Sequence, residues 1–158
     1  MRYIPKQLSL KDKKNQKRMI LLSKKLYKKG KYFTRKKLSS FHSQPSKHIV
    51  KAKKIYGVEK IVPSKELSQA TGCSVSALQK IVKKGEGAYF SSGSRPNQTA
   101  QSWGYARLAS AITGGKSAAI DYDILKSGCQ PNKTAMRLAN QSLKKYGFGK
   151  RKSKKINI

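Results

Sequence analysis

Apolar residues recur at helical spacing along most of this chain, and residues that commonly end helices separate the stretches. Ser9 can cap a first helix that runs toward Leu26, because its side-chain oxygen can accept a hydrogen bond from the first turn. Met19, Leu22 and Leu26 then fall on one face of this helix. Gly30 follows where a glycine often closes a helix. The pattern therefore predicts a helix near the N-terminus with one apolar side.

Later stretches repeat this pattern. A second helix should begin after Ser46 and stop at Gly57. A short helix is expected around Ile124 and Leu125, and a last one should run from Asn132 until a glycine ends it. The positions expected to face the core in the second and last helices are Ile49, Ala52, Ile55, Tyr56, Met136, Leu138 and Leu143.

These elements predict a mainly α fold, a small helical domain with a helix-turn-helix-like unit and basic flanking arms. A small hairpin near Tyr89 or near Ile61 is an open alternative, because short apolar runs fit either structure. The expected regions are a basic N-terminal part (1–60), a central helical domain (61–143) and a basic tail (144–158).

Residues 63–85 have the pattern of a helix-turn-helix. Ser64 can cap a first helix, Gly72 can adopt the positive φ of a tight turn, and Ser74 can cap a second helix. The expected packing positions are Leu67, Leu78 and Ile81. The same arrangement also serves in protein docking, so the motif alone leaves DNA reading and docking open.

If this unit reads DNA, its second helix would enter the major groove. Gln79 is the strongest candidate for reading a base edge, so sequence specificity should be weak. The candidate contacts of this helix are Ser74, Ser76, Gln79, Lys80 and Lys83.

The net charge is the property of the sequence that most strongly indicates a binding partner. The 158 residues include 37 Lys and Arg against 6 Asp and Glu, a formal net charge of +31. Self-repulsion of this size opposes compaction unless a polyanion neutralises it, and nucleic acid is the commonest such partner. An anionic membrane surface would require a sustained apolar helix face or a long hydrophobic run, and the sequence offers neither. The DNA or RNA phosphate backbone is therefore the expected partner.

Basic residues concentrate at the two ends of the chain, and those of the N-terminal part alternate with aromatic residues. The aromatic residues are Tyr27, Tyr32, Phe33 and Phe41. A solvated lysine face is the alternative interpretation of such a run. The candidate phosphate contacts are Lys24, Lys25, Lys28, Lys29, Arg35, Lys36, Lys37, Lys150, Arg151 and Lys152.

Neither the cysteines nor the N-terminus suggests an extracellular protein. Cys73 and Cys129 have no second pair, and their distance from His42 and His48 gives no zinc-ligand spacing. Reduced structural thiols are therefore expected. The N-terminus has no secretory pattern, which predicts an intracellular site of action.

A Gly/Ser-rich loop followed by a helix (86–115) forms a second candidate site. Backbone N–H groups of such a loop can hold an anion, and Arg95 and Arg107 could add bidentate donors. Alternatively the loop is a rigid polar turn, and Arg107 pairs with Asp121 or Asp123. The loop lacks the spacing of a nucleotide-binding motif.

The segment Arg95-Pro96-Asn97-Gln98-Thr99, followed by Trp103 and Ala106-Arg107, resembles an uncharacterised domain of large DNA viruses and some tailed phages. The resemblance covers roughly residues 63–128 and includes the helix-turn-helix-like segment. It implies a viral protein of the virion or of genome handling, located in the virion or in the nucleus or cytoplasm of the infected cell. It implies no catalytic activity.

Three functions are consistent with these features. The leading hypothesis is a protein that coats, condenses or anchors viral DNA through phosphate contacts, largely independently of sequence. The second is a minor capsid or scaffold protein whose basic arms contact other virion components. The third, a nuclease, would need Asp121 and Asp123, with Glu86 or His48, to hold Mg²⁺, and six carboxylates are few for this role. We expect no enzyme activity, no cofactor, no metal and no transmembrane segment.

Overall fold

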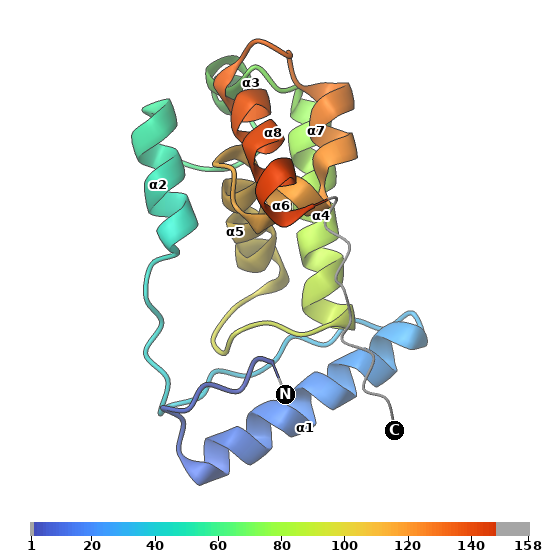
Figure 1. The fold of residues 1–158 in the computed structure, drawn as a ribbon. Coiled ribbons are helices and arrows are strands. Elements are labelled where there is room, and N and C mark those ends of the chain that lie inside the picture. Colours follow the sequence, from blue (N-terminus) through green and yellow to red (C-terminus); the bar gives the residue numbers. More distant parts are fainter. Residues whose placement is uncertain (1, 148–158) are drawn as a thin grey trace.

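The computed structural model describes residues 2–147, and the secondary structure there is helical apart from one isolated bridge between Cys73 and Cys129 (Figure 1). The predicted mainly α fold is confirmed. The helices of the described part are α1 (Leu10–Lys28), α2 (Lys47–Tyr56), α3 (Lys65–Thr71), α4 (Val75–Ser91), α5 (Ala100–Ile112), α6 (Lys116–Ile120), α7 (Tyr122–Gly128) and α8 (Thr134–Tyr146).

Helices α2 to α8 form one helical body, and α1 lies across the end of this body that α4 reaches with its C-terminal turns (Figure 1). Apolar residues from all of these helices share one core, whose side chains are removed from water. Its fully buried larger residues are Leu67, Leu78, Ile81, Leu108, Ile112 and Leu125. Residues 47–60 were assigned from the sequence to the basic N-terminal part (1–60), but they contribute Ala52 and Val58 to this core.

Helices α4 and α5 pack at a glycine-lined crossing. A Cβ atom added to Gly85 would lie 2.6 Å from the Cα of Gly104, and one added to Gly104 would lie 2.7 Å from the carbonyl oxygen of Val82. Only glycine permits this approach. The sequence predicted that a loop begins near Gly85, but α4 continues to Ser91, because packing against α5 outweighs the low helix propensity of glycine. The hairpin alternative at Tyr89 is excluded by the same helix.

The N-terminal part has its own small core. Leu8, Met19 and Leu38 are buried there, and Ile4, Phe33 and Phe41 pack against them. Two of the aromatic residues that were predicted to interleave with bases in a binding groove, Phe33 and Phe41, therefore support this core instead.

Helix α1 begins as predicted, because the Oγ of Ser9 accepts a hydrogen bond from the backbone N–H of Asp12. The Asp12 carboxylate accepts hydrogen bonds from the backbone N–H and the Oγ of Ser40, and these lower its pKa. The prediction for Leu22 was wrong, since it is 41% exposed. The buried side of α1 includes polar residues that bond to loops, which apolar spacing alone does not reveal.

Hydrogen bonds from one buried and one half-buried polar residue fix the N-terminal part to the helical body. The Gln16 side-chain amide donates to the carbonyl oxygens of Tyr3 and Ser94. The Asn97 side chain accepts from the backbone N–H of Leu38 and donates to the carbonyl oxygens of Leu38 and Phe41. The loop before α5 thus connects the two cores.

Candidate nucleic-acid interface

Helix α1 carries a row of basic side chains on the side opposite its buried residues. Its buried residues are Asp12, Gln16, Met19, Ile20 and Ser23. Bases three, four and seven positions apart occupy the outer side, since such residues share one face of a helix. We call the outer residues Lys11, Lys14, Lys17, Arg18, Lys25 and Lys28 the α1 basic face. All but Lys25 and Lys28 were missed in the candidate set, although their spacing was visible in the sequence.

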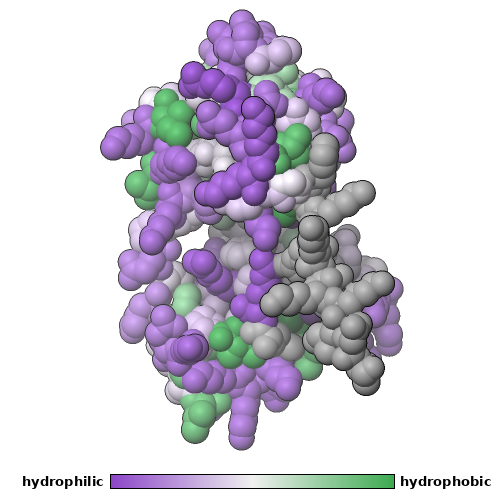
Figure 2. Space-filling model, viewed as in Figure 1, coloured by the Kyte–Doolittle hydropathy of each residue, from purple (hydrophilic) through white to green (hydrophobic). Residues whose placement is uncertain are grey.

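The α1 basic face is long and has no acidic residues along it. From Lys11 to Lys28 the helix rises roughly 26 Å at about 1.5 Å per residue. Duplex DNA carries about 15 negative charges over that length of its axis. Asp12 lies on the buried side, and no acidic residue occurs between it and Glu59. In Figure 2, hydrophilic residues cover most of the visible face of the helical body, and hydrophilic residues with some apolar ones between them cover the part that contains α1. This geometry allows several phosphates to be contacted at once.

The other basic residues of the N-terminal part that were predicted to contact phosphate differ in exposure. Lys29, Lys36 and Lys37 are exposed, and Lys24 is half-buried beside the α1 basic face. The predicted contacts Lys150, Arg151 and Lys152 lie outside the described residues.

Arg35 was predicted to contact phosphate, but this prediction is corrected because Arg35 lies inside the protein at 6% exposure. Its Nη1 donates to the Oγ of Ser23 and to the carbonyl oxygen of Tyr89, and its Nη2 donates to the Oγ of Ser94. Its guanidinium also lies 3.8 Å from the centroid of the Tyr89 ring, a cation–π contact. Burial lowers the pKa of Arg35. Arg35 therefore joins α1 to α4, and its donors are not directed at solvent.

The segment from α3 to α4 has the local structure that its sequence predicts. The Oγ of Ser64 caps α3, Gly72 adopts φ 75°, and the Oγ of Ser74 accepts from the N–H of Ala77 at the start of α4. The predicted contacts of α4 are all exposed; they are Ser74, Ser76, Gln79, Lys80 and Lys83. The turn thus presents one side of α4 to solvent.

A disulfide between Cys73 and Cys129 braces this turn. The expectation of reduced thiols was wrong, because folding brings together two cysteines that are 56 residues apart. Two backbone hydrogen bonds flank the disulfide, from Ser74 to the carbonyl oxygen of Gly128 and from Gln130 to that of Gly72. The turn between α3 and α4 is therefore attached to the segment between α7 and α8.

Helix α7 lies beside the exposed side of α4. Ser76 and Lys80 of α4 line a shallow groove together with Asp123 and Ser127 of α7. The carboxylate of Asp123 repels phosphate, which offsets part of the attraction of Lys80. The α4 surface is therefore less favourable to a polyanion than the α1 basic face.

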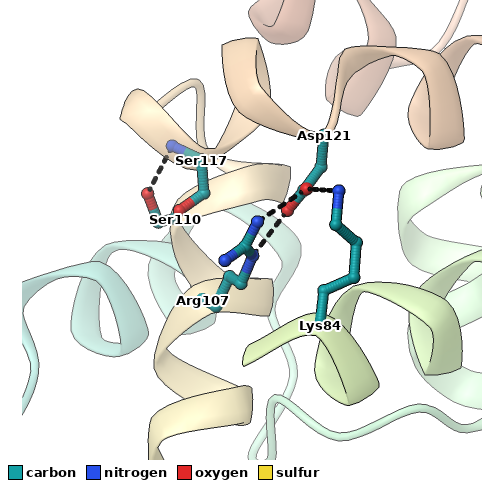
Figure 3. A network of polar contacts seen from close by, with 5 residues as sticks. All are labelled: Lys84, Arg107, Ser110, Ser117 and Asp121. Carbon is teal, nitrogen blue, oxygen red and sulfur yellow. Dashed lines mark hydrogen bonds and ion pairs between the residues drawn. The ribbon is translucent and has the colours of Figure 1, made fainter. Parts of the chain in front are cut away.

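Arg107 is bound to a buried carboxylate rather than directed at solvent (Figure 3). Its Nε and Nη2 each lie 2.8 Å from an oxygen of Asp121, and the Nζ of Lys84 lies 2.8 Å from the same carboxylate. Nearby, the N–H of Ser117 donates to the Oγ of Ser110, which fixes the start of α6. From the sequence, Arg107 could either bind phosphate or pair with Asp121 or Asp123. The structure shows the pair with Asp121, so the prediction of Arg107 as a phosphate contact is corrected. This network connects α4, α5 and the junction of α6 with α7.

The loop that carries Arg95 uses most of its polar groups internally. Ser94 bonds to Arg35, and Asn97, with φ 61°, bonds to the N-terminal part as described above. These contacts match the alternative of a rigid polar turn. Arg95 itself is exposed and lies near His48, whose pKa is lowered first by burial and then by the charges of Lys51 and Arg95.

The acidic residues considered for Mg²⁺ are not brought together. Within residues 2–147, no three side chains of His, Cys, Asp or Glu gather as metal ligands. Asp121 is buried against two cations, whereas Asp123 is exposed in the groove beside α4.

No helix in the described part is both long and apolar enough to cross a membrane.

Residues 3–136 match the family of unknown function DUF5824. The chain belongs to this family. The match extends beyond residues 63–128, so the DUF5824 region includes α1 with its basic face, the helical body and the start of α8. The expected membership of an uncharacterised domain is thereby confirmed. No curated protein and no solved structure matches the chain.

Proposed function

We propose that this DUF5824 protein binds nucleic acid, largely independently of sequence, through phosphate contacts of the α1 basic face. The observation that carries the proposal is that this face is long and exposed and that, within residues 2–147, none of its basic residues forms an ion pair. Counterion release from a phosphate backbone would supply the free energy of binding.

The carboxylates of the described part neutralise few of its bases. In residues 2–147, the ion pairs formed are those of Lys84 and Arg107, and both involve Asp121. Asp12 bonds to Ser40 instead of to a base. The cations of the α1 basic face therefore keep most of their attraction for a polyanion, and a bound polyanion would relieve their mutual repulsion.

Helix α4 would have a secondary role in this proposal. Gln79 is the strongest candidate of its exposed set for reading a base edge, and Asp123 opposes phosphate close by. Contacts of α4 and Arg95 would orient the protein on the duplex, whereas the α1 basic face would supply most of the affinity. A viral role in coating or anchoring DNA, which the resemblance implies, belongs to this proposal.

A charge-neutral variant of the α1 basic face tests the proposal. Lys14, Arg18, Lys25 and Lys28, which lie in one row, are replaced together by Gln. The matched control replaces four exposed lysines on other helices, Lys116, Lys126, Lys144 and Lys145, by Gln. Binding of full-length chains to a labelled DNA duplex is then measured across a salt series.

Each lost phosphate contact reduces the slope of log K against log salt by about 0.9. The α1 variant should therefore lose up to about 3.6 of the slope, and the control should lose clearly less. Equal losses in both variants would show that net charge alone governs binding and would overturn the role of the α1 basic face. Failure of the unaltered chain to bind DNA would favour the capsid or scaffold alternative.

A further inference from the structure

Three aromatic rings gather where α1 ends against α4, and we call Tyr27, Tyr32 and Phe90 the aromatic cluster. The rings of Tyr27 and Phe90 are nearly parallel, at 10° with centroids 6.2 Å apart. The ring of Tyr32 lies 5.0 Å from that of Phe90 at 57°. Phe90 is half-buried, but Tyr32 is 73% exposed. The aromatic cluster therefore presents the ring of Tyr32 to solvent, and the ring of Phe90 packs against it.

A glycine turn creates this arrangement. After α1, Gly30 adopts φ 71°, its N–H donates to the carbonyl oxygen of Tyr27, and the N–H of Lys31 donates to that of Leu26. This pair of bonds is the Schellman motif, which reverses the chain at a helix end. The reversal returns Tyr32 to the rings of Tyr27 and Phe90. The exposed position of Tyr32 thus results from an ordered turn.

The surroundings of the aromatic cluster are basic. Lys28, Lys29 and Lys31 lie between its two tyrosines in the sequence and are exposed. The nearest acidic residue along α4 is Glu86, which faces α5, because its Cγ would lie 3.3 Å from a Cβ added to Gly104. An apolar protein partner gains nothing from these lysines, whereas a phosphate-linked chain with aromatic bases is complementary to both features.

We propose that the aromatic cluster binds an unpaired nucleobase, with the ring of Tyr32 stacked on the base and the adjacent lysines on the flanking phosphates. This inference rests on the proposed nucleic-acid function and adds a preference for single-stranded segments. Stacking of this kind tolerates any base, because every base has a π-face. It also tolerates DNA and RNA alike, so both are used as probes.

The test measures affinity of the full chain for oligothymidylate, for oligouridylate and for a thymidylate strand whose central bases are replaced by abasic sites. Tyr32→Ala removes the exposed ring, and Tyr32→Phe retains it. Tyr146→Ala is the matched control, since Tyr146 is also exposed at a helix end beside lysines. Thermal melts of each variant check that the fold is kept.

Tyr32→Ala should bind the intact strands about tenfold more weakly than the unaltered chain. Tyr32→Phe and Tyr146→Ala should bind them as the unaltered chain does, and the abasic strand should be insensitive to Tyr32→Ala. If Tyr32→Ala binds intact strands normally while duplex binding stays steeply salt-dependent, the stacking site is refuted and the proposed function stands. If neither strands nor duplex are bound, both proposals are refuted.

Discussion

The disulfide between Cys73 and Cys129 should account for a large share of the stability of the helical body. The two residues are 56 positions apart, so the disulfide closes a long loop in the unfolded chain. In the chain-entropy treatment, a loop of this length contributes about 4 kcal/mol at 25 °C. For a chain of this size, 1 kcal/mol corresponds to about 2–4 °C in Tm, which predicts a decrease of roughly 8–16 °C on reduction.

Thermal melts followed by circular dichroism, with and without reductant, measure this change. A variant with Cys73→Ala and Cys129→Ala is the control, and its melt should not respond to reductant. Thiol titration of the oxidised, unfolded protein should find no free thiol. Two titratable thiols, or an unchanged melt on reduction, would refute the disulfide and the bracing of the turn before α4.

Two further predictions concern buried polar groups. Arg35→Lys should lower the free energy of unfolding in urea by about 2–4 kcal/mol, because one ammonium cannot replace the bonds to Ser23, Tyr89 and Ser94; a loss under about 0.5 kcal/mol would contradict the internal role of Arg35. Burial raises the pKa of Tyr56, whose hydroxyl donates to the carbonyl oxygen of Ile112. Because the neutral phenol is favoured in the folded state, the stabilisation by Tyr56 is complete below about pH 10, the usual tyrosine pKa, and is lost as pH rises beyond it. The drop in Tm above this pH should be smaller in Tyr56→Phe, and an equal drop would contradict the assignment.

Local signals predicted the segment from α3 to α4 well. Ser64, Gly72 and Ser74 each act within a few residues of their own position, so their roles as caps and turn are visible in the sequence. The length of α4 was not visible, because Gly85 resembles a helix end until Gly104 of α5 is known to lie against it. A contact between distant segments decided that boundary.

The same distinction explains which site residues were found. Arg35 and Lys36 are adjacent and both basic, yet Arg35 is buried and Lys36 is exposed. The difference arises because only Arg35 reaches Tyr89 of α4. The pairing of Arg107 with Asp121 was one of two stated alternatives, and their positions on α5 and at the start of α7 select it. Charge patterns thus suggested nucleic acid as the partner, which stays a prediction, whereas the exposure of each basic residue could be known only from the packing.

The most direct test of the account is the affinity of the full chain for a labelled DNA duplex across a salt series. The six bases of the α1 basic face, at about 0.9 each, predict a straight line of log K against log salt with a slope of about −5 or steeper. A slope near zero, or no binding at physiological salt, would contradict phosphate binding as the central property of this protein.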